Sequence, residues 1–163
     1  MMLAGDGDVR PYDYVMKADD DTYIRLDALA ETLRRAPRED MYYGVGLPFM
    51  DSQSPPFMLG MGYLVLSWDL VQWIATSDMV RSQVKGVEDV TTGNWLNKGN
   101  KAKNRVNIYP RMYDYKSAQP KDFLNDTIGV HQLKEGISWA HTLEHFNAIH
   151  FDPSSRAQQP LPS

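Results

Sequence analysis

The sequence predicts an α/β protein, because segments with strand character alternate along the chain with segments whose apolar residues have helical spacing. The chain has 163 residues, of which 42% are hydrophobic and 11% aromatic. This length and composition are enough for one folded domain with a hydrophobic core. We expect a short lead over residues 1–11, the domain over 12–151, and a disordered tail over 152–163, which is rich in Pro, Ser and Gln.

The first half of the chain contains three predicted strands and two predicted helices. Residues 12–18 and 41–45 have the apolar character of buried strands, and a helix between them ends before Pro37. Residues 57–66 are apolar but are interrupted by Gly60 and Gly62, which indicate a strand bend or a close approach of the backbone to a ligand. Ser67 is expected to cap the helix that follows.

The second half is predicted to contain shorter elements. Residues 86–96 have the character of a loop that leads into a short helix, and residues 97–105 are polar and basic. Two short strands are expected over 106–109 and 127–131, and a last helix over 139–146.

Composition excludes several classes of function. The net charge is −4, from 17 basic and 21 acidic residues, so the chain has no overall attraction for nucleic acid or an anionic membrane. The absence of cysteine excludes disulfides, cysteine-based zinc sites and thiol catalysis. No run of about 18 apolar residues is present, so we expect no membrane span and no targeting segment in this chain.

Three consecutive carboxylates, Asp19, Asp20 and Asp21, follow the first predicted strand. Adjacent acids repel one another unless a positive charge lies among them. Because α/β proteins bind ligands at the carboxyl ends of strands, the run indicates either a solvated acidic turn or a divalent-cation site for a phosphate-bearing substrate.

A phosphoaspartate hydrolase is a third interpretation of the same run, with Asp19 as nucleophile and Asp21 as acid or base. Those enzymes require a small residue after the second Asp, and Thr22 follows it here. This interpretation predicts a Mg²⁺-dependent phosphatase activity that is abolished by Asp19→Asn.

Two further polar positions are candidates for chemistry. Glu88 and Asp89 lie where a loop enters a predicted helix, where a carboxylate acts as a general base toward a hydroxyl or simply complements the helix dipole. His131 ends a predicted strand, where it is either a packed histidine or a further ligand in a carboxylate site for a metal such as manganese.

The remaining motifs have plainer interpretations. His141, Glu144 and His145 match the H-x-x-E-H zinc pattern, but an amphipathic helix is the better interpretation, because a third ligand is missing. Trp95 is either a core residue or a platform for a sugar ring. The basic side chains of 97–105 are expected to be solvated, with contact to a diphosphate or an anionic acceptor as the alternative; they are Lys98, Lys101, Lys103 and Arg105.

Four segments in a fixed order carry a family resemblance: KADDDTYIRLDAL (17–29), YYGVGLP (42–48), FMLGMGYLVLS (57–67) and GVEDVTTGNWL (86–96). Together with the segment 126–147, they resemble glycosyltransferase family 31, the β-1,3-galactosyltransferase and β-1,3-N-acetylglucosaminyltransferase family. The resemblance implies a GT-A-like mixed sheet flanked by helices. Its N-terminal nucleotide-binding half, membrane anchor and stem have no counterpart here, so we expect a C-terminal fragment.

The resemblance also implies roles for the residues singled out above. Asp21 and His131 would bind Mn²⁺, with Mg²⁺ as the alternative, and Asp89 would be the base on the acceptor hydroxyl. The donor sugar-nucleotide would be contacted by the other five positions, which are Asp19, Asp20, Gly60, Gly62 and Glu88.

The implied activity is a metal-dependent, inverting transfer of galactose or N-acetylglucosamine from a UDP-sugar to a hydroxyl of a glycan or glycoprotein, in β-1,3 linkage. The implied location is the Golgi lumen, with a membrane anchor in the parent protein. The alternative is a non-catalytic remnant that binds carbohydrate or a protein partner. The transferase interpretation requires the Asp21 carboxylate and the His131 ring to lie close together.

Overall fold

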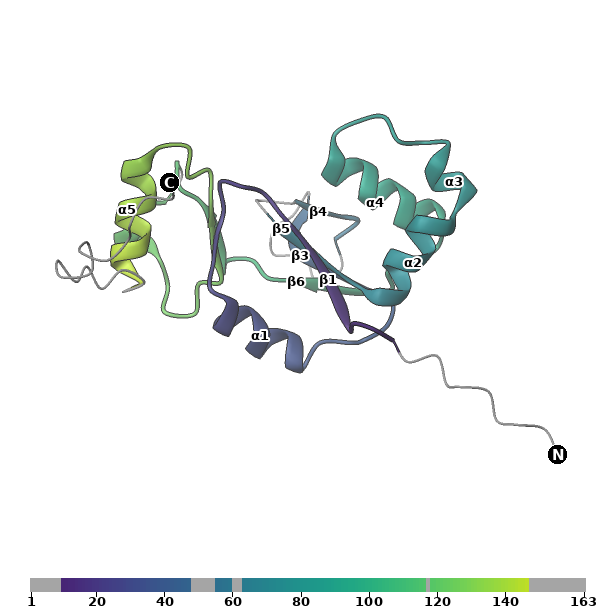
Figure 1. The fold of residues 1–163 in the computed structure, drawn as a ribbon, viewed down its shortest axis with the longest axis horizontal. Helices are drawn as coiled ribbons and strands as arrows, with labels where there is room; N and C mark the ends of the chain where they lie inside the picture. The colour runs from purple at the N-terminus through teal and green to yellow at the C-terminus, as the bar shows by residue number, and fades with distance from the viewer. Residues whose placement is uncertain (1–9, 48–54, 60–62, 117, 147–163) are drawn as a thin grey trace, which may run out of the picture.

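The computed structural model describes residues 10–47, 55–59, 63–116 and 118–146. Over these residues the chain has the predicted mixed α/β architecture, with one sheet of five strands and one of three, flanked by helices (Figure 1). Among them, no helix has the length and apolarity that crossing a bilayer requires.

Strand β3 (Met41–Leu47) is the central strand of the larger sheet. Its first half pairs antiparallel with β5 (Tyr63–Ser67) and parallel with β6 (Asn104–Asn107), and its second half pairs antiparallel with β4 (Phe57–Leu59). Strand β1 (Tyr14–Ala18) pairs antiparallel with the other edge of β5. The sheet therefore contains both strand orientations.

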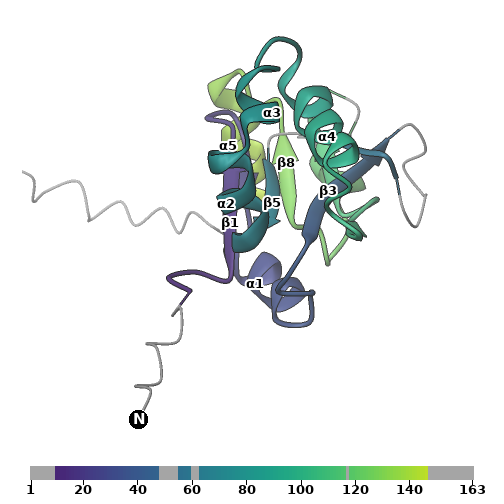
Figure 2. The same cartoon turned by 90° about the vertical axis from the view of Figure 1, so that its right-hand side faces the viewer.

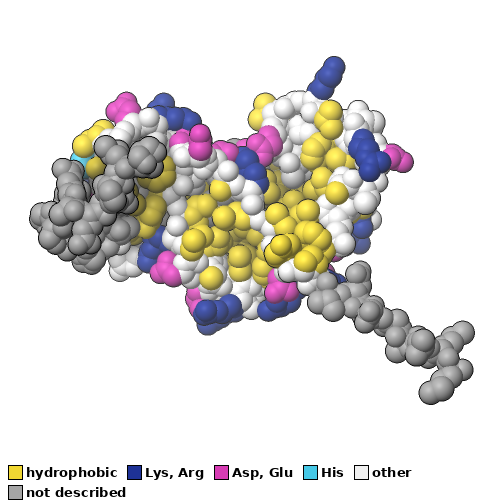
Figure 3. Space-filling view, viewed as in Figure 1, with side chains coloured by type: hydrophobic (Ala, Val, Ile, Leu, Met, Phe, Trp, Pro, Cys, Tyr) yellow, Lys and Arg dark blue, Asp and Glu magenta, His cyan; other side chains and the backbone are white. Residues whose placement is uncertain are grey.

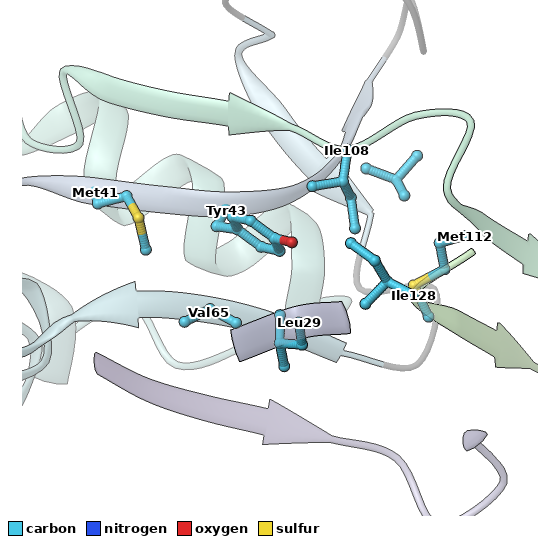
Figure 4. Packing of buried hydrophobic residues seen from close by; sticks show 8 residues of the cluster. Leu29, Met41, Tyr43, Val65, Ile108, Met112 and Ile128 are labelled. Atoms are coloured by element: carbon cyan, nitrogen blue, oxygen red, sulfur yellow. The ribbon is translucent and has the colours of Figure 1, made fainter. Parts of the chain in front are cut away.

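Helices cover both faces of this sheet (Figures 1 and 2). On one face, α1 (Leu26–Arg34) buries Leu29 in a cluster with Met41, Tyr43 and Val65 (Figure 4). On the other face, α2 (Trp68–Thr76) and α4 (Glu88–Lys98) bury apolar side chains in a second cluster with Tyr42. Alternate residues of β3 point to opposite faces of the sheet, and helices cover both faces. The residues on both sides of the strand are therefore buried, which explains its continuous apolar run.

The smaller sheet has the order β2 (Tyr23–Ile24), β8 (Gly129–His131), β7 (Met112–Asp114). Strand β2 is antiparallel to β8, and β7 is parallel to it. Helix α5 (Gly136–His145) and the short 3₁₀ helix Pro120–Asp122 lie beside this sheet, over an aromatic-rich cluster that includes Phe123 and Trp139. This sheet carries the C-terminal contribution to the site described below.

The predicted elements of the larger sheet are present with shifted ends, except that the single strand expected over 57–66 is two strands, β4 and β5. Helix α4 is longer than the short helix expected. Strands β2 and β7 and the four-residue helix α3 (Asp78–Arg81) were not predicted, since two to four residues are too few to display a period. Residues 60–62 and 147–163 lie outside the described residues, and with them Gly60, Gly62 and the predicted tail.

Ser67 occupies the N-cap position of α2, but its side chain does not cap that helix. The buried hydroxyl instead accepts a hydrogen bond of 2.9 Å from the Met41 backbone N–H at the start of β3. The capping prediction was wrong about this role, because the neighbouring strand presents an N–H that requires a partner in the interior.

Candidate metal centre

Asp19, Asp21 and His131 lie together, although the last two are 110 positions apart in the sequence. Each offers one ligand atom to a group in which all such atoms lie within 4.8 Å of one another. His131 Nε2 is 3.5 Å from Asp21 Oδ1 and 3.6 Å from Asp19 Oδ2. The carboxylate and the imidazole therefore lie close together, as the transferase interpretation requires.

Strand pairing explains this proximity. The two aspartates lie between β1 and β2, and β2 pairs with β8 in a register that sets Tyr23 opposite Val130. Continuing this register backwards brings Asp21 next to the residues that follow His131, and the Leu133 N–H donates a 3.0 Å hydrogen bond to the Asp21 carbonyl. The carboxylates thus follow a strand of the larger sheet, and the histidine belongs to a strand of the smaller sheet.

Asp114 fixes the orientation of the His131 ring. The parallel register of β7 and β8 pairs the two residues, and Asp114 Oδ1 lies 2.7 Å from His131 Nδ1. A carboxylate at this distance holds the proton on Nδ1, which leaves the Nε2 lone pair facing Asp19 and Asp21. Carboxylate–histidine pairs of this kind orient imidazoles that bind metals.

Two lysines neutralise part of the acidic charge. The Lys134 ammonium contacts the Asp21 carboxylate, which is 7% exposed, and this contact holds the pKa of Asp21 below its ordinary value against the opposing effect of burial. Lys17 contacts both Asp19 and Glu88, with its nitrogen 3.0 Å from Glu88 Oε2. Burial opposes the charge of Lys17, but these two carboxylates outweigh it and raise the pKa of the lysine.

The residues of this group fit a divalent cation. Two carboxylates and an oriented imidazole nitrogen are a donor set that suits Mn²⁺, and the carboxylates also suit Mg²⁺. The mostly buried Asp21 carboxylate already has one positive partner, the Lys134 ammonium, because a buried charge is costly without one. Asp20 is exposed and lies outside the group, whereas Asp19, which the resemblance assigns to the donor, contributes an oxygen to it.

Glu88 and Asp89 lie at the start of α4, across from the aspartates. The Lys17 bridge joins Glu88 to Asp19 and so ties the helix start to the candidate metal group. Asp89 is half-buried near Tyr42; burial raises the pKa of Tyr42 to about 12, and the Asp89 charge adds to the effect. Figure 3 shows acidic side chains on both sides of a hollow in the upper edge of the molecule, between the parts that carry α5 and α4.

The residues of the H-x-x-E-H pattern do not form a zinc site. His141 Nδ1 lies 3.1 Å from the Tyr115 hydroxyl, and the His145 ring packs edge-on against Phe123 and Phe146. Within the part of the chain that the structure describes, the only cluster with metal-binding geometry is Asp19, Asp21 and His131. The predicted amphipathic helix is the interpretation that agrees with the structure.

Basic side chains of residues 97–105 make contacts within the fold, whereas they were expected to be solvated. Arg105 is half-buried: its guanidinium donates to the carbonyls of Pro55 and Pro56 at 2.7 and 2.6 Å, and to Asn97 Oδ1 at 2.6 Å. Lys101 lies over the Trp73 ring, and Lys98 donates to Gln83 Oε1. Arg105 therefore holds the loop before β4 against α4, and its guanidinium donors are already engaged within the fold.

Three residues around the site were not singled out from the sequence. Lys17 lies just before the acidic run in the sequence, and Lys134 lies just after His131. A search for basic residues near the candidate ligands would therefore have found both. Asp114 ends a three-residue strand, and its partnership with His131, 17 positions later, depends on the parallel register of β7 and β8.

We expect Asp114→Ala to weaken Mn²⁺ binding by about 10- to 100-fold, because loss of a carboxylate behind a histidine ligand costs that much affinity. Asp114→Asn should have a smaller effect, since an amide oxygen still accepts from Nδ1–H. Calorimetric Mn²⁺ titrations measure the affinities, and ¹⁵N NMR of His131 measures the tautomer. Equal affinities in all three proteins, with an unchanged tautomer, would contradict the positioning role.

The fold and the site together define a class: an α/β protein with a carboxylate–imidazole group where two sheets meet, suited to a divalent cation. Comparison with known proteins finds a similar protein in zebrafish (Danio rerio), UDP-GalNAc:β-1,3-N-acetylgalactosaminyltransferase 2, which is 32% identical over 101 residues. The match covers 52% of this chain and 20% of the zebrafish protein. No protein-family model and no solved structure matches the chain. The relative is a glycosyltransferase, which agrees with the resemblance at that level.

Proposed function

We propose that this chain forms the metal-binding and acceptor side of a glycosyltransferase of the family 31 type. The proposed reaction moves a hexose or N-acetylhexosamine from a UDP-sugar to the hydroxyl of a glycan or glycoprotein acceptor, with inversion and in β-1,3 linkage. The observation that carries the proposal is the meeting of Asp19, Asp21 and His131 at one point. The zebrafish relative, whose name specifies a UDP-sugar donor and a β-1,3 linkage, supports the same class.

The proposed ligands of the cation are Asp21 and His131, with Asp19 beside them. When bound, Mn²⁺ supplies charge that offsets the negative charge growing on a diphosphate leaving group. The residues of the chain would have separate tasks: Asp114 holds the imidazole, and Lys17 holds Asp19 and Glu88 together. The cation would take the place at Asp21 where the Lys134 ammonium now lies.

Inversion requires a single in-line displacement, and therefore one base opposite the leaving group. Asp89 is the proposed base: its carboxylate takes the proton of the acceptor hydroxyl as the oxygen bonds to the anomeric carbon and the bond to UDP breaks. A carboxylate can do this because the hydroxyl becomes acidic as the new bond forms. Asp89 is half-buried at the start of α4, next to Glu88, which Lys17 joins to Asp19 of the candidate metal group.

The proposal predicts that UDP binds only when Mn²⁺ is present. Isothermal titration with UDP, with Mn²⁺ and then with excess EDTA, tests this dependence in a protein that joins the chain to the nucleotide-binding half implied by the resemblance, and uridine is the control because it lacks the diphosphate. Equal UDP affinity with and without the metal would contradict the proposal. Binding of acceptor glycans without any binding of UDP would instead indicate a non-catalytic carbohydrate-binding remnant.

A further inference from the structure

A cavity of about 450 Å³ lies on the far side of α4 from the sheet, between that helix and the loop of residues 82–87. Four of its lining residues, Thr91, Asn94, Trp95 and Lys98, follow one face of α4 at helical spacing. The loop supplies the other four, which are Ser82, Gln83, Val84 and Lys85. Nothing in the proposed metal centre or in the proposed base accounts for this cavity.

The cavity is held open by specific contacts. The Trp95 indole N–H donates to the Gln83 carbonyl at 2.8 Å, and Lys98 donates to Gln83 Oε1 at 2.5 Å, so the loop is anchored to the helix on one side. Gly86 has a φ of +134°, and a Cβ added there would lie 2.7 Å from Thr91 Oγ1. This glycine lets the loop approach the first turn of α4 at Thr91, which is one of the residues that line the cavity.

The lining has the chemistry of a carbohydrate site. It combines one large aromatic surface with hydroxyl, amide and ammonium groups, and no carboxylate is among its lining residues. Sugar rings present apolar C–H faces, which pack on an indole, and hydroxyls, which hydrogen-bond to groups such as the Thr91 hydroxyl and the Asn94 amide. Val84 is 67% exposed and adds apolar surface at the rim.

The position along α4 relates this cavity to the proposed base. Trp95 follows Asp89 by six residues, which is about 9 Å along the helix axis, and the two side chains leave different faces of the helix. A ligand that fills the cavity and also reaches Asp89 must therefore span this distance along α4. A chain of sugar units has this reach, whereas a single monosaccharide does not.

We propose that this cavity binds an acceptor oligosaccharide, and that Trp95 stacks on a sugar unit behind the one whose hydroxyl reacts at Asp89. The assignment of the acceptor rests on the proposed function; the binding of a glycan at Trp95 is tested by itself. The site selects acceptors by length, because only an oligosaccharide occupies both the cavity and the position at Asp89.

The test uses oligosaccharides of two to six sugar units, ending in galactose, N-acetylglucosamine or N-acetylgalactosamine. Their binding to the chain is followed by tryptophan fluorescence and calorimetry. Longer members should bind more tightly than shorter ones, and Trp95→Ala should weaken their binding by roughly tenfold. Trp95→Phe should retain part of the affinity, since it keeps an aromatic face.

Asn94→Ala is a third variant and should keep the fold, because Asn94 is only half-buried and alanine is a strong helix former. It should also weaken glycan binding, while metal-dependent UDP binding stays unchanged in every variant. Absence of glycan binding by the wild-type chain, or equal glycan affinity in the wild type and all three variants, would overturn the inference. Loss of the UDP response alone would count against the proposed function and not against this cavity.

Discussion

Replacing Asp21 with asparagine is expected to reduce the affinity of the chain for Mn²⁺ by more than the roughly 100-fold that loss of a supporting outer residue costs. Asparagine keeps the size of the side chain but removes the negative charge, which is the main attraction for a divalent cation. Asp21 is the most buried carboxylate of the group, at 7% exposed, so water compensates for its loss less than at an exposed acid.

Asp20→Asn is the matched control, because it removes the same charge one residue away from a side chain that is exposed and lies outside the group. Its effect on Mn²⁺ affinity should be small and should shrink further at high salt, since only long-range attraction is lost. Mn²⁺ titrations followed by electron paramagnetic resonance measure both affinities. Equal losses in the two variants would mean that the acidic run attracts cations without coordinating one.

The fold should survive Asp21→Asn. The partner that loses its counter-ion is Lys134, whose side chain is 65% exposed and therefore regains water easily. The backbone carbonyl of Asp21, which accepts the Leu133 N–H, is unchanged by the substitution. The thermal unfolding midpoint of Asp21→Asn should therefore be close to that of the wild type. Measuring it distinguishes loss of metal binding from loss of the folded structure.

The sequence predicted the elements of the larger sheet because their apolar runs are long enough to show a period. Strand β3 and helix α1 are examples: one is apolar throughout and buried on both faces, and the other repeats apolar residues at helical spacing. Strands β2 and β7 could not be predicted in this way. Each exists because it pairs with β8, which lies far from β2 in the sequence and 17 positions from β7.

The residues of the candidate site also divide into those that could be predicted from the sequence and those that could not. The acidic run and His131 could be selected as candidates because each ends a predicted strand, but their proximity was an expectation from the family resemblance. Asp114 could not be selected, since its role depends on the parallel register that sets it opposite His131. Arg105 shows the converse: a residue expected in a solvated basic loop is instead part of the packing around β4.

Asp89→Asn is expected to lower the turnover number of the transfer reaction by about 10²- to 10⁴-fold, the usual contribution of a general base. Asparagine keeps the shape of the side chain but cannot accept the proton of the acceptor hydroxyl. The transfer reaction is to be assayed with a form of the protein that binds UDP in the presence of Mn²⁺. Because Asp89 lies outside the candidate metal group, metal-dependent UDP binding should be unchanged.

Glu88→Gln is the matched control for Asp89→Asn, since the two acids are adjacent at the start of α4 and their charges act similarly on the helix dipole. Glu88 is bridged by Lys17 to Asp19, so its loss should act mainly on the KM for the donor, while the turnover number falls much less. If Glu88→Gln instead lost the larger share of turnover, the base would be Glu88. In that case α4 would present its first carboxylate, and not its second, to the acceptor.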